Sequence, residues 1–273
     1  MKSKDLFPGI FSRNAVAYSS RLNGMMQRGE ARGRQRVIEL ANARPGMRIL
    51  DLACGPGNLS RRLAALVSPG GEVIGVDLAP GMVEVARAAA IPNARFEVMD
   101  IEQLTFEDAS FDAAVCGHGL LFAGDVGLAL REARRVLRTG APLAASVPLA
   151  DSGKSVWRDL DAVIDRWLPP APQAVDQPPT RETVGDPVAF RQAALDAGFR
   201  SARVEAVEET VHWESAEQLA SMFASWWDCA ARIEGIDTGR RGAFVDEATA
   251  ALRREHPGRI ETTGRNHVLL AEA

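Results

Sequence analysis

A glycine-rich turn with an acidic residue in front of it is the part of the sequence best suited to chemistry. The apolar segment 48–53 contains Asp51 and leads through Gly55 and Gly57 into a helical pattern. A strand, a tight turn and a helix bring the backbone close to a ligand at the carboxyl edge of a parallel sheet, because glycine has no Cβ. The pattern of dinucleotide enzymes requires a third glycine three places after Gly57, and this sequence has none there. Since the acid would repel a pyrophosphate, the turn favours a cationic ligand.

Two further acids end the next two predicted strands. Asp77 lies 22 residues after Gly55, and Asp100 is followed by Ile101. A carboxylate at the first position can accept hydrogen bonds from both hydroxyls of a ribose. A carboxylate at Asp100 can accept a hydrogen bond from the amine of an adenine, with Ile101 beside the ring. A single aspartate at a strand end is often a cap or turn former, but three around one glycine turn indicate a nucleoside that carries a sulfonium and an ammonium.

Strands and helices alternate through the first half of the chain. The strands are predicted at 48–53, 72–77, 96–100, 111–116 and 142–147, and the helices between them at 58–67, 80–90 and 125–138. Such alternation is typical of βαβ units with helices on both faces of the sheet. The prediction is an α/β fold with a doubly wound, Rossmann-like, mostly parallel sheet.

The two ends of the chain have different patterns. Residues 14–44 predict helix, and after residue 148 the predicted helices are 155–168, 187–197, 216–233 and 240–256, with a proline-rich loop at 169–179 and strands at 202–213 and 266–271. No strand separates the last two helices, so we expect them to form a cap. The expected organisation is N-terminal lid helices (1–45), a ligand-binding core (46–148), a helical substrate cap (149–200 and 214–258) and strands that complete the sheet (201–213 and 259–273).

Five segments in a characteristic order resemble one enzyme family. They are residues 18–23, ILDLACGPG at 49–57, VIGVDLAPGMVEVAR at 73–87, LTFEDASFDAAV at 104–115 and ALREARRVLRTGAPL at 129–143. Over residues 14–148 the chain resembles class I S-adenosylmethionine-dependent methyltransferases, closest to the branch of quinone-ring C-methyltransferases and other small-molecule enzymes. The resemblance implies a seven-stranded sheet whose last strand is antiparallel. It does not extend past residue 150, where the acceptor would be recognised.

The resemblance also implies which residues hold S-adenosylmethionine. They are Tyr18, Asp51, Ala53, Gly55, Gly57, Asn58, Asp77, Leu78, Met82, Asp100, Ile101 and Gly117. Tyr18 belongs to the leading helix, where it either closes the site or only packs between helices. Arg21 or another early arginine is expected to pair with the carboxylate of the cofactor, and the sequence does not choose among them.

His118 is the candidate catalytic residue. Methyl transfer from a sulfonium is an in-line displacement in which the protein mainly aligns the reactants and excludes water. A base is needed only when the acceptor starts protonated. His118 follows the predicted strand 111–116, at the sheet edge where the methyl group should project, and histidine can take a proton near neutral pH. The alternative is that it only forms a wall of the cofactor pocket.

Composition excludes several other classes of protein. The chain has 32 Lys and Arg against 36 Asp and Glu, a net charge of −4, which disfavours a nucleic-acid binder. No apolar run approaches the ~20 residues of a membrane span, and the first residues lack the apolar core of a secretory signal. Three cysteines without metal-type spacing fit a reducing cytoplasm and no bound metal. The oligomeric state is not readable from the sequence.

The function that the sequence favours is therefore methyl transfer to O, N or C of a small, hydrophobic or aromatic metabolite. All five tryptophans follow residue 150 and either line the acceptor pocket or form the core of the cap. Three alternatives stay open: a cyclase or isomerase of the same fold that binds the cofactor without methyl transfer, a nicotinamide-linked oxidoreductase, and a non-catalytic binding subunit.

Overall fold

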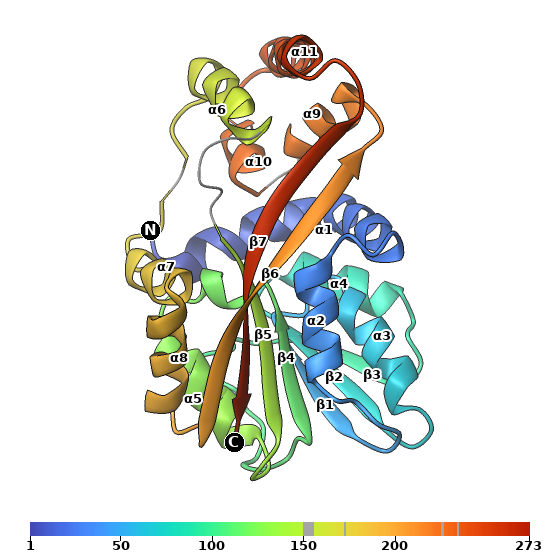
Figure 1. Ribbon diagram of the computed structural model, residues 1–273, viewed down its shortest axis with the longest axis vertical. Helices are drawn as coiled ribbons and strands as arrows, with labels where there is room; N and C mark the ends of the chain where they lie inside the picture. Colours follow the sequence, from blue (N-terminus) through green and yellow to red (C-terminus); the bar gives the residue numbers. More distant parts are fainter. Residues whose placement is uncertain (150–155, 172, 225–226, 234) are drawn as a thin grey trace.

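The computed structural model describes the chain except for residues 150–155, 172, 225–226 and 234. Its centre is a seven-stranded sheet in the order β3-β2-β1-β4-β5-β7-β6 (Figure 1). The strand bounds are β1 Arg48–Leu52, β2 Glu72–Asp77, β3 Ala94–Val98, β4 Ala113–Gly117, β5 Pro142–Pro148, β6 Ser201–Trp213 and β7 Ile260–Glu272. Neighbouring strands from β3 to β5 pair parallel, and β7 pairs antiparallel with both β5 and β6. The predicted doubly wound fold is confirmed.

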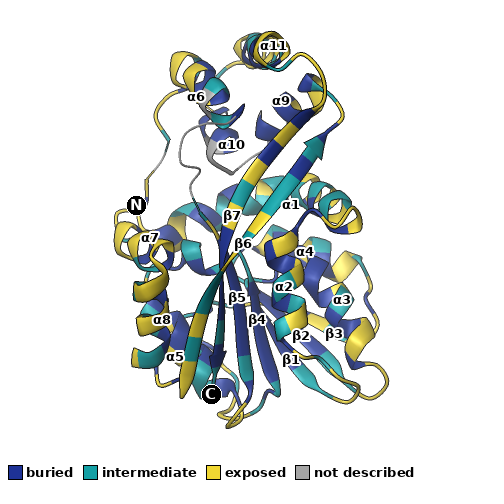
Figure 2. Ribbon diagram, in the orientation of Figure 1, coloured by how far each residue is buried: buried dark blue, intermediate teal, exposed yellow. Residues whose placement is uncertain are grey.

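Helices cover both faces of the sheet, because strands of a parallel sheet are apolar on both sides. One face packs against α2 (Arg32–Leu40), α3 (Asn58–Val67) and α4 (Pro80–Ala88). The other packs against α5 (Val126–Val136) and α8 (Pro187–Asp196). Figure 2 shows the central strands buried and the outer sides of these helices exposed. None of the described helices combines the length and apolar content needed to cross a membrane.

The N-terminal segment forms two helices where one helical segment, 14–44, was predicted. Helix α1 runs over Ser3–Gln27 and lies between the sheet and the cap, and a turn that includes Gly29 at φ +73° separates it from α2 (Figure 1). It begins before the predicted start although Pro8 removes one helical hydrogen bond. Burial of Phe7 and Ile10 on α1 compensates for that loss, and local sequence pattern does not reveal such tertiary packing.

Other differences concern the second half of the chain. Helix α7 (Pro178–Gly185) forms within and just after the segment predicted as a proline-rich loop, because proline is tolerated in the first turn of a helix. Two helices, α9 (Ala216–Ala224) and α10 (Trp227–Ile233), replace the single helix predicted at 216–233. Strand β7 starts at Ile260 and not at residue 266, since its first residues pair with β6 alone.

The cap has an apolar core of its own around the outer ends of β6 and β7. Helices α6 (Val156–Trp167), α9, α10 and α11 (Thr238–Glu255) surround these strand ends (Figure 1). The indole of Trp157 stacks on Phe223 at 5.7 Å between ring centroids, and Trp213 Nε1 donates to Thr262 Oγ1 at 2.9 Å. Trp157, Trp167 and Trp213 therefore belong to the core of the cap. The side chains of Trp226 and Trp227 lie outside the described part of the chain.

Candidate functional site

A cavity of about 750 Å³, counting its open mouth, lies at the carboxyl ends of the central strands and under α1. This edge is where ligands bind in open α/β sheets. The cavity is lined by ten of the residues that the sequence predicted for the site: Tyr18, Ala53, Gly55, Asp77, Leu78, Met82, Asp100, Ile101, Gly117 and His118. The fold thus brings most of the predicted site together from α1 and the ends of β1 to β4.

Asp77 joins the end of β2 to the turn after β1. Its Oδ2 accepts a hydrogen bond from the backbone N–H of Gly55, and its Oδ1 accepts one from Ala79, both at 2.8 Å. Burial raises the pKa of Asp77, and these two bonds oppose the rise. A carboxylate has about four acceptor positions, so two remain for a diol that enters the cavity.

The turn after β1 leaves room for a ligand. Gly55 has φ +55°, and a Cβ placed there would meet only Tyr18, at 4.0 Å across the cavity. Ala53 also has positive φ, and a Cβ on Gly119 would come within 2.3 Å of the Ala53 Cβ. The open space at Gly55 and the carboxylate of Asp77 beside it fit the ribose and methionine portions of S-adenosylmethionine.

Three predicted cofactor residues, Asp51, Gly57 and Asn58, are not among the residues that line the cavity. Asp51 is 1% exposed, and its Oδ2 accepts from Ser60 Oγ at 2.5 Å. Burial raises the pKa of Asp51 to about 7, although the Ser60 bond opposes this. The carboxyl group of Asp51 thus bonds to α3 and is not part of the cavity wall, and its predicted contact with the cofactor stays a prediction.

Gly57 and Asn58 contact the elements that pack around the turn after β1. Gly57 precedes α3 with φ +80°, and a Cβ there would lie 3.1 Å from the Phe96 ring. Asn58 Nδ2 donates to Asn23 Oδ1 at 2.6 Å, which ties α3 to α1. Both residues contact neighbouring elements, and their predicted contact with the cofactor stays a prediction.

Asp100 forms an ion pair with the first turn of α1. Its Oδ2 lies 2.6 Å from Lys4 Nζ, and Glu102 Oε2 lies 2.9 Å from the same nitrogen. Its Oδ1 accepts from the backbone N–H of Glu102 at 2.9 Å. The acid expected to accept an adenine amine thus also holds the lid helix, and it retains acceptor positions for that amine.

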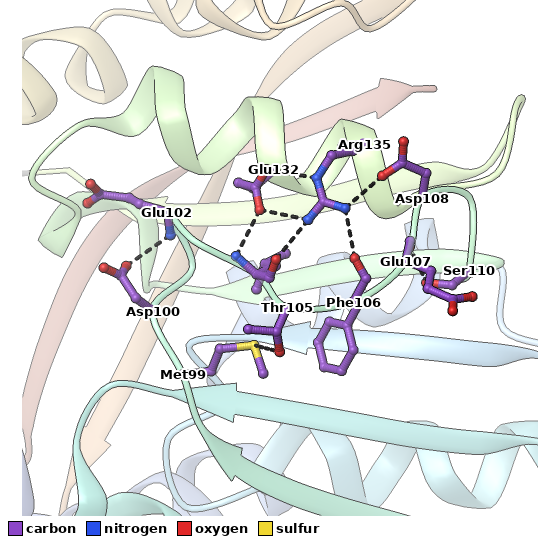
Figure 3. Close-up of polar contacts among 11 residues, drawn as sticks. Met99, Asp100, Glu102, Thr105, Phe106, Glu107, Asp108, Ser110, Glu132 and Arg135 are labelled. Carbon is purple, nitrogen blue, oxygen red and sulfur yellow. Dashed lines mark hydrogen bonds and ion pairs between the residues drawn. The ribbon is translucent and has the colours of Figure 1, made fainter.

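Arg135 on α5 fixes the loop that carries Asp100. Its Nη1 donates to the carbonyl of Phe106 at 2.7 Å, and its Nη2 donates to the carbonyl of Leu104 at 2.8 Å. Glu132 accepts from the backbone N–H of Leu104 at 2.8 Å and pairs with Arg135, which lowers the pKa of Glu132 (Figure 3). These bonds fix the loop after β3, and they join two of the segments that carry the family resemblance, 104–115 and 129–143.

His118 lies at the end of β4 with a backbone conformation that histidine seldom adopts. Its φ is +69°, and its N–H donates to the carbonyl of Ser146 on β5 at 2.9 Å. Burial lowers the pKa of His118 well below its usual value, the charge of Arg34 lowers it further, and Asn266 raises it. The side chain is therefore neutral at neutral pH, and the lowered pKa makes it a weaker base than a free imidazole.

Arg34 is the early arginine that the structure places beside the predicted site. It is 7% exposed, its Nη2 donates to Tyr18 Oη at 2.9 Å, and its Nε is buried without a hydrogen-bond partner among the described residues. Arg21 lies over the other side of the Tyr18 ring, 5.1 Å from the centroid. The sequence left open which arginine serves the site. Arg34 and Arg21 both contact Tyr18, which lines the cavity, so the choice of Arg34 is a proposal.

Aromatic side chains that sequence reasoning missed form part of the cavity wall. Phe7 and Phe11 on α1 each meet the ring of Phe122 edge to face at 5.0 Å between centroids. All three rings line the cavity, together with Pro8. No sequence motif singles out Phe7 and Phe11 on α1 or Phe122 after β4, because only the folded chain brings the three rings together.

Comparison with known proteins agrees with this geometry. Residues 49–140 match the model of a methyltransferase domain. The chain is 34% identical over 213 residues to 2-phytyl-1,4-naphtoquinone methyltransferase of Synechococcus elongatus, which covers 73% of this chain and 91% of the relative. It is 39% identical over 168 residues to an uncharacterized 37.1 kDa protein in transposon Tn4556 of Streptomyces fradiae, and that match spans 46% of the relative and 60% of this chain.

The chain belongs to the S-adenosylmethionine-dependent methyltransferases. Among solved structures, a Bacillus halodurans protein superimposes with a TM-score of 0.56 at 18% identity, over 88% of this chain and 97% of that one. A (4+2)-cyclase superimposes with a TM-score of 0.51 at 21% identity, over 88% and 80%. At these identities the likeness establishes the fold alone. Membership of the family makes the chain a methyltransferase, with S-adenosylmethionine as its cofactor.

Proposed function

We propose that this methyltransferase acts on a small aromatic acceptor with a quinone-like ring. The observation that carries the proposal is the aromatic wall, formed by Phe7, Phe11 and Phe122, in the same cavity as Asp77 and His118. Planar rings pack well against edge-to-face aromatic side chains. The name of the Synechococcus relative, a naphthoquinone methyltransferase, supports the same acceptor class.

The residues of the chain have separate tasks toward the cofactor, which supplies a methyl group already activated by a sulfonium. Asp77 accepts hydrogen bonds from the ribose hydroxyls, and Asp100 accepts one from the adenine amine. Arg34, whose Nε is buried without a partner among the described residues, binds the carboxylate of the methionine portion together with Tyr18. Helix α1 covers the nucleoside and excludes water.

At the acceptor end, orientation is the main contribution of the protein. The ring of the acceptor lies against the aromatic wall, and its reacting atom reaches the side of the cavity near His118. Holding the reactants in line raises their effective concentration to ~10⁵ M or more. His118 accepts the proton that a hydroxylated ring gives up, because its imidazole is neutral at neutral pH.

The other function classes have less support. The cyclase shares the fold, whereas the relative that is 34% identical over 91% of its length is a named methyltransferase. Nicotinamide binding lacks the third glycine of its fingerprint. A thermal-shift comparison of S-adenosylhomocysteine with NAD tests that alternative, because only the former should raise the unfolding temperature.

The test of the proposed function uses S-adenosylmethionine with a labelled methyl group. The full chain is incubated with reduced 1,4-naphthoquinone carrying an alkyl chain, and with glycine as a polar control acceptor. We expect label in the ring product and none in glycine. Label in neither product, under conditions where calorimetry shows bound cofactor, would contradict the proposed acceptor class.

A further inference from the structure

Three side chains at neighbouring strand ends have buried polar atoms without hydrogen-bond partners among the described residues. They are Nε2 of His118, Oγ of Ser146, and both Oδ1 and Nδ2 of Asn266. Ser146 and Asn266 are 0% exposed. Buried polar groups in folded proteins are nearly always paired, and unpaired ones gather where a ligand or a proton is handled. A group of three therefore indicates a function that the fold alone does not require.

Strand register places the three side chains together. Ser146 on β5 lies opposite Gly117, the residue before His118, and Asn266 on β7 lies opposite Pro148. Alternate residues of a strand share a face, so Ser146 shares that of Ala144, which packs on the α2 side of the sheet. Asn266 reaches the same side, because a Cβ on Gly33 of α2 would lie 2.7 Å from its Cγ.

His118 lines the cavity, and its backbone N–H bonds to β5 at Ser146, next to the strand β7 that carries Asn266. Arg34 on α2 is the charged group that acts on His118, and Tyr18 on α1 accepts a hydrogen bond from Arg34. Behind the sheet, His267 faces the other way, with Nδ1 3.1 Å from the carbonyl oxygen of Val184. Ser146 and Asn266, the residues of β5 and β7 with unpaired buried polar atoms in the described part of the chain, are both neutral.

A neutral imidazole has one nitrogen that donates and one that accepts. If the amide oxygen of Asn266 accepts from Nε2–H, Nδ1 keeps its lone pair and is free to take a proton. A neutral partner of this kind fixes the tautomer and the ring orientation without adding a charge. Its carbonyl dipole also favours the imidazolium that forms when the proton arrives, against the adverse effect of burial and of Arg34.

We propose that Asn266, supported by Ser146, is a positioning residue that holds His118 in the Nε2-protonated tautomer, and that the acceptor belongs to the class that gives up a proton on methylation. The inference rests on the proposed function. The acceptor loses the proton of a ring hydroxyl to Nδ1 of His118, and the electron pair left on the ring system forms the new bond to the methyl carbon. The pair of the broken carbon–sulfur bond stays on sulfur, and the proton leaves His118 for solvent.

The first experiment observes His118 directly and needs no acceptor. The full chain is labelled with ¹⁵N-histidine, saturated with S-adenosylhomocysteine and titrated by NMR, and His118→Gln identifies the resonance. We expect the Nε2-protonated tautomer in the wild type. In Asn266→Asp the pKa of His118 should rise by about one unit or more, because a carboxylate replaces an amide. In Asn266→Ala the tautomer preference should disappear.

An Nδ1-protonated tautomer in the wild type would overturn the positioning role, even if Asn266→Ala failed to fold. Equal titration curves in the wild type and in Asn266→Asp would overturn it as well. Asn42→Asp, an exchange of the same kind on the surface, serves as the matched control and should leave the resonance unchanged. Affinity for S-adenosylhomocysteine should stay within about twofold in each variant, so a failure of cofactor binding is recognised separately.

The second experiment tests the acceptor class. Reduced 1,4-naphthoquinone is compared with its dimethyl ether, which has the same ring and no hydroxyl proton. Only the free diol should receive label, and Asn266→Ala should lower its kcat about tenfold or more with KM for S-adenosylmethionine unchanged. Equal labelling of the ether would overturn the proton-loss class while it left methyl transfer to aromatic rings intact.

Discussion

The backbone N–H of Gly55 donates a hydrogen bond of 2.8 Å to Oδ2 of Asp77. This contact couples the turn after β1 to the end of β2, so one carboxylate both shapes the turn and faces the cavity. Any residue except proline could donate this bond, so the requirement for glycine comes from the φ of +55° at Gly55. The bond also means that a change at Asp77 alters the backbone at Gly55 as well as the polar contact with a ribose.

Asp77→Asn should weaken the binding of S-adenosylhomocysteine by about tenfold or more. The amide replaces a charged acceptor with a weaker one and brings a donor toward the N–H groups of Gly55 and Ala79. Isothermal titration calorimetry measures the change. Glu97→Gln, on the half-exposed side of β3, is the control that should bind as the wild type does. Wild-type affinity in Asp77→Asn would contradict the assigned ribose contact.

Asp51 should make stability depend on pH. Its pKa is about 7 in the folded chain against 3.8 for the free side chain, so the folded state holds the proton longer. The free energy of unfolding therefore falls as pH rises from about 4 to about 7, and this group contributes up to about 4 kcal/mol to the fall. Above that range its contribution is constant. Asp51→Asn should remove this fall. Urea unfolding at pH 5, 6, 7 and 8 measures the free energy of unfolding. An equal dependence of that free energy on pH in the wild type and in Asp51→Asn would contradict the expectation.

Gly119→Ala should destabilise the chain by about 1–3 kcal/mol. The added Cβ would lie 2.3 Å from the Cβ of Ala53 and 2.9 Å from Cys116 Sγ, so the turn that lines the cavity must shift. Gly185→Ala is the matched control, because no atom lies within 4 Å of its added Cβ. Urea midpoints measure both. A midpoint for Gly119→Ala equal to that of the control would show that the turn adapts freely.

Arg135→Ala should loosen the loop between Asp100 and Ser110. The variant loses the bonds to the carbonyls of Leu104 and Phe106, which costs about 2 kcal/mol. Hydrogen exchange of residues 99–110 should become faster, and affinity for S-adenosylhomocysteine should drop a few-fold. Arg131→Ala, exposed on the same helix, should leave both properties unchanged. Unaltered exchange in Arg135→Ala would remove Arg135 from its assigned role.

Lys4→Met should make the lid helix open more often. The Lys4 side chain is 39% exposed and that of Asp100 is 22% exposed, so the ion pair contributes about 1 kcal/mol or less to stability. Its loss should nevertheless raise the dissociation rate of S-adenosylhomocysteine a few-fold, as stopped-flow fluorescence can measure. Lys2→Met, on the exposed residue before α1, is the control. A dissociation rate equal to that of the control would contradict the expectation that the ion pair of Lys4 with Asp100 holds α1 over the cavity.

The sheet and most of the cavity wall could be predicted because their determinants are local. The apolar runs 48–53 and 72–77 are short and bounded by turns, and the acids that end strands lie where a parallel sheet gathers its carboxyl edges. Gly55, Asp77 and Asp100 therefore appear in the right place without knowledge of the packing. The family resemblance added Leu78 and Met82 to them.

What the sequence did not reveal depends on contacts between distant segments. The resemblance placed Asp51 at the ligand, whereas its carboxyl group bonds to Ser60 on the following helix. The choice of Arg34 over Arg21 stays a proposal, because both contact Tyr18 in the folded chain. Asn266 lies 148 residues from His118 in the chain, and strand pairing alone brings them near one another.

The most direct test of the central claim is a crystal structure of the full chain with S-adenosylhomocysteine bound. The account predicts that both ribose hydroxyls lie within hydrogen-bond distance of Asp77, with the adenine between Met82 and Ile101 and its amine at Asp100. A nucleoside bound elsewhere, or a ribose held by other side chains while Asp77 keeps only its bonds to Gly55 and Ala79, would contradict it.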